Sequence, residues 1–300
     1  MKTKLTDFQS LTPIDYGWSG DKKYRAVTAD GTPYFLRITT RERGDRFVKL
    51  FDLQKAVAAT GIPMCEPVAI GECDEGIYAI HTWIDGVDAE ATVPTLSDEA
   101  QYRLGCDAGR HLTRIHSIPA PAHQSDWEAR FNAKIDRKIK LYAECPIHFE
   151  GDRHLLRFIE ENRHLLCGRP QTFQHGDYHI GNMMLTSPEK DPRIVVIDFD
   201  RYDFGDPWEE FNRIVWCAQA APLFATGMVD GYFGVDEKTA VPTEFWRLLA
   251  LYISSNMLSS IPWAIPFGEG ELTTMLNQAR DVLAWYDNMK NPVPTWYKAT

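Results

Sequence analysis

The feature that most constrains the fold of this chain is a change of sequence periodicity near residue 84. Before this point, short segments rich in strand-forming residues are separated by glycine-containing turns. After it, apolar residues recur every three or four positions, the pattern of helices packed on a core. A chain of 300 residues is also long for a single hydrophobic core. We therefore expect an α+β protein with a small β-rich N-lobe over residues 1–83 and a larger, mainly α-helical C-lobe over residues 84–300.

The expected N-lobe consists of two hairpins with one helix between them. Residues 23–28 and 33–39 flank Asp30-Gly31, a strong hairpin signal. Residues 67–72 and 77–84 form the second pair of strands, and residues 46–60 are helix-like up to Gly61. Alternation within the second strand places Tyr34, Leu36 and Ile38 on one face and Phe35, Arg37 and Thr39 on the other.

The expected C-lobe is helical except around one polar motif. Ser97 is the predicted N-cap of a helix whose apolar stripe contains Leu104, Ala108, Leu112 and Ile115. The run Ile194-Val-Val-Ile197 predicts a short buried strand. Residues 245–267 are rich in apolar side chains, but Arg247, Asn256, four serines and Pro262 interrupt them. This segment is predicted to be a core helix rather than a membrane span.

Composition narrows the classes of partner. The net charge of −10 argues against a nucleic-acid partner and permits a cationic one. The six cysteines are scattered without a C-x-x-C pair, which is typical of reduced thiols in a cytoplasmic protein. The N-terminal sequence MKTKLTDFQS lacks the apolar core of a signal peptide. We expect a cytoplasmic protein with no membrane association.

The most informative motif is "QHGDYHIGN", residues 174–182. Its two histidines, aspartate and asparagine are compatible with a metal site, a catalytic loop or a polar turn. Asp198 follows at the end of the predicted strand, sixteen residues after Asn182. Phosphoryl transfer uses a carboxylate to receive the acceptor's proton and oxygen ligands for Mg²⁺ on the nucleotide phosphates. In this chemistry Asp177 would be the base, and Asn182 and Asp198 would be the metal ligands.

The chain resembles the aminoglycoside phosphotransferase family, whose bilobal fold is similar to that of protein kinases. The resemblance extends from about residue 16 to residue 216. Its motifs are "GIPMCEP", "TWIDG", "LGCDAGRHLTRIHSI", "HGDYHIGN" and "VIDFDRYDFGDPWEEF", in that order. It implies a nucleotide- and Mg²⁺-dependent kinase that phosphorylates a hydroxyl group of a small molecule, with an aminoglycoside as the leading acceptor.

The resemblance also implies nucleotide contacts in the N-lobe. The turn before the first hairpin would cover the phosphates through Ser19, Gly20 and Lys22. Arg37 stands where such enzymes usually have a phosphate-binding lysine, and a planar guanidinium is not equivalent to an ammonium. Asp52 is the nearest acid on the helix that could partner Arg37.

The segment "TWIDG" fits the linker between the lobes. Backbone groups of Thr82 and Ile84 would read the adenine or guanine ring, so side chains do not distinguish ATP from GTP. An ordinary strand end followed by a turn is equally compatible with these residues.

Two further residues are expected to support the site. His175 is predicted to brace the catalytic loop by hydrogen bonding to the backbone. Asp206, with Pro207 and Glu209 after it, matches a helix N-cap, a proline at N1 and a glutamate at N3.

Other functions remain open at this level. The same motifs would serve a kinase of another metabolite, such as a sugar, an amino alcohol or a macrolide. A metal-dependent hydrolase could use His175, Asp177, His179 and Asp198. A non-catalytic nucleotide-binding module is the third alternative. The oligomeric state is not predicted.

Overall fold

The computed structural model describes residues 4–15 and 20–298. The chain forms two compact units. Unit 1 contains Met1–Ala89 and Asn182–Tyr202, and unit 2 contains Glu90–Gly181 and Asp203–Thr300. Unit 1 is mostly β-sheet and unit 2 is mostly helix, so the predicted α+β class is confirmed. The predicted lobe boundary between residues 83 and 84 stays a prediction. The compact units differ from the predicted lobes because residues 182–202 pack with the first unit.

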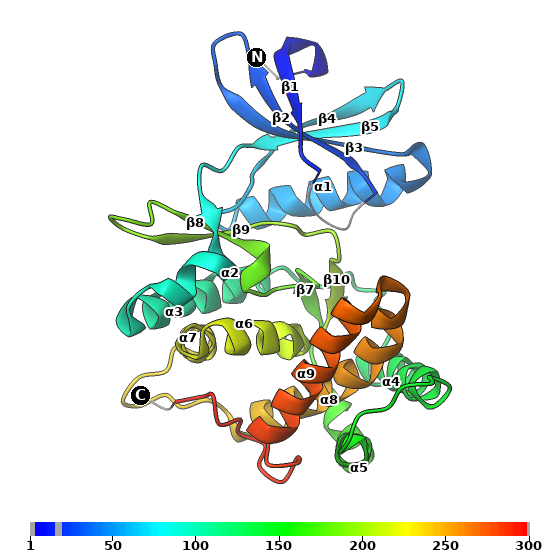
Figure 1. Ribbon diagram of the computed structural model, residues 1–300. Helices are drawn as coiled ribbons and strands as arrows, with labels where there is room; N and C mark the ends of the chain where they lie inside the picture. Colours follow the sequence, from blue (N-terminus) through cyan, green and yellow to red (C-terminus); the bar gives the residue numbers. More distant parts are fainter. Residues whose placement is uncertain (1–3, 16–19, 299–300) are drawn as a thin grey trace. The chain divides into compact units, whose positions relative to one another are not determined.

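The larger sheet of unit 1 is antiparallel. In the described chain it comprises the following strands, in spatial order: β1 (Phe8–Pro13), β2 (Lys22–Thr28), β3 (Pro33–Thr39), β5 (Gly76–Thr82) and β4 (Pro67–Cys73) (Figure 1). The β2–β3 and β4–β5 hairpins are those expected from the turn signals at Asp30-Gly31 and Asp74-Glu75-Gly76.

Helix α1 (Gly44–Ala58) packs on one face of this sheet. Phe47 and Phe51 of α1 contact Ala79 of β5, and the guanidinium of Arg37 lies over the Phe47 ring. Leu36 and Ile38 belong to the apolar cluster on the other face, with Ala26 and Ile80. The alternation in β3 therefore sorts its side chains as predicted, and Arg37 points to the α1 side.

A smaller sheet completes unit 1. Among the described residues it joins β6 (Val87–Asp88), β8 (Met183–Thr186) and β9 (Arg193–Val196), with β8 in the middle. The amide of Val196 donates to the carbonyl of Pro63 at 2.9 Å. This bond attaches the β8–β9 hairpin to the segment that follows α1.

Unit 2 is built around long helices with short strands at the predicted catalytic loop. Its α-helices include α2 (Ala89–Thr92), α3 (Asp98–Ile115), α4 (Trp127–Ala143), α5 (Asp152–Asn162), α6 (Ile214–Ala220), α7 (Pro222–Phe233), α8 (Thr243–Ala264) and α9 (Glu269–Trp285). Its strands are β7 (Thr172–Gln174) and β10 (Asp203–Gly205). The 3₁₀ turns are η3 (Val93–Thr95), η4 (Arg163–Leu166), η5 (Ile180–Asn182), η6 (Glu209–Arg213) and η7 (Ile265–Phe267), and η1 (Leu5–Asp7) and η2 (Arg41–Arg43) lie in unit 1.

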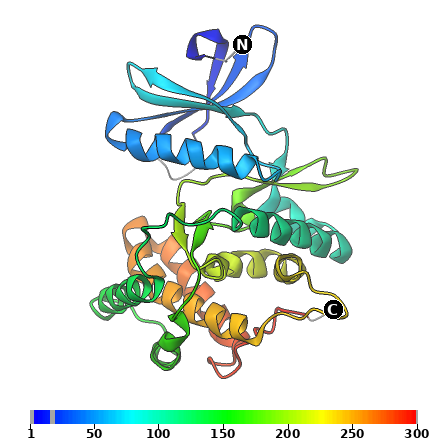
Figure 2. The ribbon, with the colours of Figure 1, turned by 180° about the vertical axis from the view of Figure 1, so that it is seen from behind.

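Helices α3 and α7 lie side by side with their backbones in close contact (Figure 2). A Cβ atom on Gly105 would lie 2.1 Å from the carbonyl oxygen of Phe224, and one on Gly227 would lie 2.2 Å from that of Tyr102. Glycine is therefore required on both helices at this crossing. Ser97 caps α3 as predicted, because its hydroxyl accepts a hydrogen bond from the Ala100 amide.

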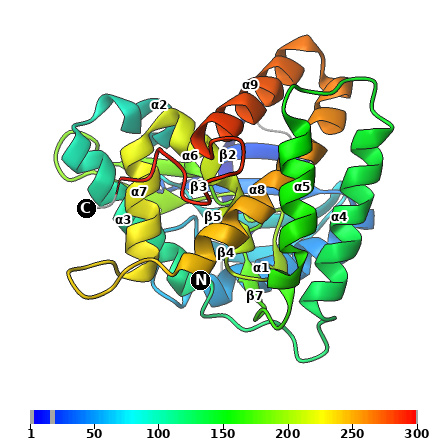
Figure 3. The same cartoon turned by 90° about the horizontal axis from the view of Figure 1, so that it is seen from below.

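Helix α8 is central to the core of unit 2 and lies beside α4 and α5 (Figure 3). Leu251 and Tyr252 of α8 share an apolar cluster with Trp127 and Phe131 of α4. The stretch Thr243–Phe267 has the length and hydropathy of a membrane-crossing helix, but 67% of its most apolar 18-residue window is buried within the protein. The segment is thus a core helix, as its interrupting polar residues indicated.

Candidate functional site

The two predicted metal ligands meet at one end of the β8–β9 hairpin. Met183 pairs with Val196 in the ladder, and the carbonyl of Asn182 accepts a hydrogen bond from the Ile197 amide at 3.1 Å. Asp198 follows with a φ of +62°, a conformation that aspartate tolerates better than most residues. An amide and a carboxylate oxygen suit Mg²⁺, which prefers hard oxygen ligands and retains several waters. Within residues 4–15 and 20–298, no group of three His, Cys, Asp or Glu is placed to hold a metal ion.

Arg37 is held between two carboxylates. Its guanidinium forms a bidentate ion pair with Asp200 and a second ion pair with Asp21. Asp21 is almost completely buried, and its other oxygen accepts hydrogen bonds from Thr39 at 2.9 Å and Arg43 at 2.7 Å. Burial alone would lower the pKa of Arg37, but Asp200 and Asp21 outweigh that effect and raise it. The cation is therefore charged and fixed.

Asp52 does not take the partner position that the sequence analysis gave it. It lies on the exposed face of α1, where its carboxylate accepts from Lys55 at 2.9 Å. The helical register places it one turn before a lysine and away from the Arg37 side. The partners of Arg37 come instead from the turn before β2 and from the residues after Asp198. For Asp21, the local signal in the sequence was its position next to Gly20, in the turn before β2.

The predicted phosphate-covering turn is only partly described. Ser19 lies outside the described residues. Gly20 is exposed, and nothing lies within 4 Å of the position that its Cβ would take. The ammonium of Lys22 forms an ion pair with Glu75 in the β4–β5 turn, with both side chains exposed. Phosphate contacts by Gly20 and Lys22 stay predictions.

At the predicted hinge, the backbone of Thr82 is already hydrogen-bonded. Its amide donates to the Glu66 carbonyl at 2.9 Å, and its carbonyl accepts from the Cys65 thiol at 3.2 Å. Its hydroxyl accepts from the Glu66 amide. The amide of Thr82 is thus engaged within unit 1, and contacts of Thr82 and Ile84 with a nucleotide base stay predictions. Ile84 lies two residues beyond the end of β5 and is half-buried.

Asp177 lies in the loop that follows β7. Its Oδ1 atom is 3.1 Å from Nε of Arg213 and 3.8 Å from Nε2 of His179. The Arg213 contact is an ion pair without hydrogen-bond geometry. The Asp177 side chain is 19% exposed. A carboxylate in this setting is ordered but open to a reactant.

Buried side chains hold the backbone of this loop. The carboxylate of Glu210 accepts from the amides of Gly176 at 2.9 Å and Tyr178 at 3.4 Å. Fully buried His175 accepts from the Asp177 amide at 3.3 Å. This is the contact that the predicted bracing role of His175 requires. Glu210 and Arg213 were missed by the sequence analysis, although both follow Asp206 within seven residues.

Asp206 is a buried ion-pair partner rather than the predicted N-cap. Its carboxylate pairs with Arg169 at 2.7 Å and accepts from the Tyr252 hydroxyl at 2.6 Å. It also accepts from the Trp208 amide at 3.0 Å within the turn before the next element, whose N-cap position is occupied by Trp208. The element that follows is η6 rather than the expected α-helix, and α6 begins only at Ile214.

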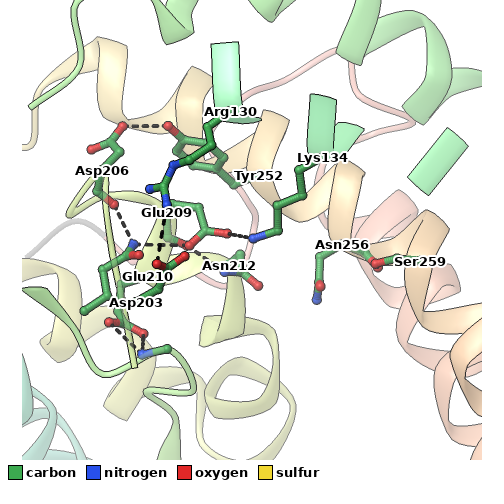
Figure 4. Close-up of polar contacts among 12 residues, drawn as sticks. Arg130, Lys134, Asp203, Asp206, Glu209, Glu210, Asn212, Tyr252, Asn256 and Ser259 are labelled. Carbon is green, nitrogen blue, oxygen red and sulfur yellow. Dashed lines mark hydrogen bonds and ion pairs between the residues drawn. The ribbon is translucent and has the colours of Figure 1, made fainter. Parts of the chain in front are cut away.

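Glu209 connects the catalytic loop to α4. Its carboxylate accepts from Gln174 at 3.2 Å. It also accepts from the ammonium of Lys134 at 3.1 Å (Figure 4). Burial raises the pKa of Glu209, but Lys134, Lys138 and Arg213 outweigh burial and hold it below its usual value. The side chain of Glu209, predicted at N3 of a helix, is thus committed to Lys134 and Gln174.

Comparison with known proteins identifies the family and fold. The model of the phosphotransferase enzyme family matches residues 10–242. No curated protein sequence is significantly similar. The chain resembles the GDP complex of wild-type aminoglycoside 2'-phosphotransferase-IIIa with a TM-score of 0.67 and 15% identity, covering 92% of this chain and 93% of the other.

Two other solved structures are similar in fold. A choline/ethanolamine kinase family protein from Mesorhizobium loti has a TM-score of 0.66 and 16% identity, covering 96% and 92% of the two chains. An amicoumacin kinase in complex with AMP-PNP, Ca²⁺ and Ami has a TM-score of 0.64 and 13% identity, covering 96% of this chain and 90% of the other. These similarities confirm the predicted kinase-like fold.

Proposed function

Since the chain belongs to the phosphotransferase enzyme family and is a phosphotransferase acting on hydroxyl groups, we propose that it transfers the γ-phosphate of a nucleoside triphosphate to a small-molecule hydroxyl. The observation that carries this proposal is the arrangement of the loop around Asp177. Glu210 accepts a hydrogen bond from the loop amide of Gly176. The carboxylate of Asp177 lies against Arg213, with one side left accessible. Fixed geometry is what phosphoryl transfer demands of the protein, because positioning and charge neutralisation supply most of the rate.

Asp177 is the proposed general base. It accepts the proton of the acceptor hydroxyl as the oxygen attacks the γ-phosphorus, and the nucleoside diphosphate leaves on the opposite side. Arg213 keeps the carboxylate in one orientation. His175 and Glu210 keep the loop backbone in place, so that the base does not have to be ordered during the reaction.

Asn182 and Asp198 are the proposed ligands of Mg²⁺. Their hairpin fixes both backbones, and the side chains provide the amide and carboxylate oxygens that this ion accepts. When bound, the ion would neutralise charge on the nucleotide phosphates. Arg37 is proposed to contribute positive charge beside the phosphates while it stays paired with Asp21 and Asp200. GDP and ADP complexes among the similar structures support nucleotide use, with ATP and GTP both to be tested.

The acceptor is proposed at the level of a small hydroxyl compound. The sequence resemblance favours an aminoglycoside, with another metabolite or a macrolide as the alternative. Similar folds belong to kanamycin and gentamicin complexes, to a choline/ethanolamine kinase family protein and to an amicoumacin kinase. The cationic side chains Arg130 and Lys134, near the catalytic loop, favour another metabolite over a polycationic aminoglycoside. All six cysteines, which lie in the described part of the chain, are free thiols, which supports the proposed cytoplasmic location.

A nucleotide-consumption assay tests the proposed function. The purified protein is incubated with Mg²⁺, with ATP or GTP, and with panels of aminoglycosides, macrolides, amino alcohols, polyols, hydroxy acids and sugar phosphates. We expect acceptor-dependent release of nucleoside diphosphate and a phosphorylated product detectable by mass spectrometry. Nucleotide binding without turnover on any panel would favour a non-catalytic binding module. Activity that follows bound zinc or iron rather than Mg²⁺ would favour the hydrolase alternative.

A further inference from the structure

One side of α4 carries a row of cations. Arg130, Lys134, Arg137 and Lys138 follow one another at helical spacing, while Phe131 and Ile135 of the same helix are buried in the core of unit 2. A helix with this division presents a single positively charged surface.

Three of these cations, Arg130, Lys134 and Arg137, line a pocket of about 310 Å³ on unit 2. Lys138, next to Arg137 in the helix, does not line the pocket but interacts electrostatically with Lys134 and Glu209. The walls of the pocket also include Trp127, Phe131 and a single acid, Asp203. With three cationic side chains and one carboxylate in its lining, the pocket has a net positive charge. Arg130 is partly committed to the protein, because it donates to the Phe204 carbonyl and to Gln171. Arg137 is exposed and reaches the pocket without any hydrogen bond or ion pair within the described chain.

The pocket is connected to the catalytic loop by direct contacts within unit 2. Lys134 lies 3.1 Å from Glu209 (Figure 4). Glu209 in turn accepts from Gln174, three residues before Asp177. On the other wall, Asp203 of β10 pairs with Gln174 of β7. Residues on both sides of the pocket are therefore connected to Gln174, the first residue of the catalytic motif. A molecule in this pocket lies beside the loop that contains Asp177.

The acids of this region are already compensated. Glu209 is paired with Lys134, Asp177 lies against Arg213, and Asp203 faces Arg130 at 3.5 Å. Lys138, by contrast, has no hydrogen-bond or ion-pair partner among the described residues. Burial, followed by Lys134, lowers the pKa of Lys138 to about 7. An ammonium in such surroundings gains most when a negative group comes close.

We infer that the α4 pocket binds a carboxylate or phosphate group of the acceptor, so that the acceptor is an anionic hydroxyl compound. The inference rests on the proposed phosphotransferase function and names its substrate class. Lys134, Arg137 and Lys138 would share the oxyanion through charge-assisted hydrogen bonds. The acceptor hydroxyl would extend past Glu209 toward Asp177. A polycationic acceptor would instead meet like charge along this wall.

The first experiment measures anion binding without catalysis. Sulfate is the probe, and thermal unfolding is followed in millimolar sulfate and in chloride at equal ionic strength. Wild type, Arg137→Met and Lys138→Met are compared with Lys140→Met. Lys140 lies on the same helix, is exposed, and pairs with Glu144 at 3.8 Å. We expect the specific sulfate stabilisation to be lost in Arg137→Met and Lys138→Met and retained in Lys140→Met. An equal response in all four proteins would overturn the inference.

The stability of the variants in chloride provides a second readout. If Lys138 binds a ligand and does not stabilise the fold, Lys138→Met should be at least as stable as wild type, because an uncompensated cation has been removed. Lower stability of Lys138→Met together with an unchanged sulfate response would assign Lys138 to the fold alone and refute the proposed role.

The second experiment uses the nucleotide-consumption assay. Hydroxy acids and sugar phosphates form two separate arms, and neutral polyols and kanamycin serve as comparisons. We expect turnover in one anionic arm, and Lys138→Met should raise KM for that acceptor about tenfold, since one charged hydrogen bond is lost, with kcat within about threefold. Turnover confined to kanamycin, or a KM unaffected by Lys138→Met, would overturn the inference. If no acceptor is phosphorylated, the proposed function fails, whereas the sulfate experiment still decides whether the pocket binds anions.

Discussion

The Nε atom of Arg213 lies 3.1 Å from Oδ1 of Asp177, and the two side chains are 23% and 19% exposed. The guanidinium thus restrains the orientation of the proposed base while leaving it accessible. We expect Arg213→Met to lower kcat by about 10- to 100-fold, because small displacements of a reacting group are costly, with the nucleotide KM unchanged. Steady-state kinetics with the identified acceptor provides the measurement.

Arg213→Lys is the matched variant for that prediction. It retains a cation next to Asp177 and should recover part of kcat, whereas Arg157→Met, a change at an exposed arginine on α5, should leave all parameters unchanged. Wild-type kcat in Arg213→Met would show that the ion pair has no role in positioning Asp177.

Asp177→Asn should remove the general base without disturbing the fold. The amide is nearly the same size as the carboxylate, but it cannot accept the hydroxyl proton at neutral pH. We expect kcat to fall by about 10²- to 10⁴-fold, the usual contribution of general-base catalysis. Nucleotide affinity, measured by calorimetry with a non-hydrolysable analogue, should stay within twofold of wild type. Asp107→Asn, at an acid on α3 that pairs with Arg110, is the control. Near-complete retention of turnover in Asp177→Asn would remove Asp177 from the mechanism.

Arg37 should contribute to stability as well as to nucleotide binding. Arg37→Met leaves Asp21, whose side chain is 1% exposed, with only part of its positive surroundings. Removing one partner of a buried ion pair costs about 3–5 kcal/mol, and we expect a loss of this size in the free energy of unfolding in urea. The double variant Arg37→Met/Asp21→Asn should recover part of the loss.

Arg37→Lys keeps the charge but loses the bidentate contact with Asp200. It should therefore be less destabilising than Arg37→Met and still weaken nucleotide binding. Arg41→Met provides a comparison at an exposed arginine that donates to the Cys73 carbonyl. Equal stability of Arg37→Met and wild type would contradict the importance of the Asp21–Arg37–Asp200 network.

His81 should make unit 1 sensitive to acid. Burial, and after it the charge of Arg37, lower the pKa of His81 from 6.5 to about 4. The unfolded chain therefore takes up a proton near pH 6.5, while the folded protein stays neutral at this residue until about pH 4. The contribution of neutral His81 is present above pH 6.5 and is lost as the pH falls toward 4, by up to about 3 kcal/mol.

The variant His81→Phe removes this titration. Phe35 and Phe51 already contact the His81 ring, so a phenyl group suits the site, although Gln54 loses its partner at every pH. We expect the difference in unfolding free energy between wild type and His81→Phe to shift in favour of the variant between pH 7 and pH 4.5. A difference independent of pH would show that His81 titrates normally.

Local sequence signals were sufficient for most elements of unit 1. The Asp30-Gly31 turn predicted the β2–β3 hairpin. The alternation of residues 33–39 predicted the face of the sheet to which Arg37 points. The helix after Asp206 was predicted less well. Asp206 accepts from the Trp208 amide, but Trp208 holds the N-cap position of the 3₁₀ turn η6, and Asp206 is committed to Arg169 and Tyr252. Those partners are distant in sequence, and a local pattern contains no information about them.

The sequence by itself determined the polar motifs, their order and the strand and helix periodicities, because these depend on neighbours within one or two turns of the chain. Only the tertiary structure decided that Arg37 pairs with Asp21 and Asp200 instead of Asp52, and that Glu210 and Arg213 hold the Asp177 loop. It also decided that Lys134 of α4 pairs with Glu209, which accepts from Gln174. Ion pairs and pocket charge depend on which distant side chains are desolvated together, and that is a property of packing rather than of spacing.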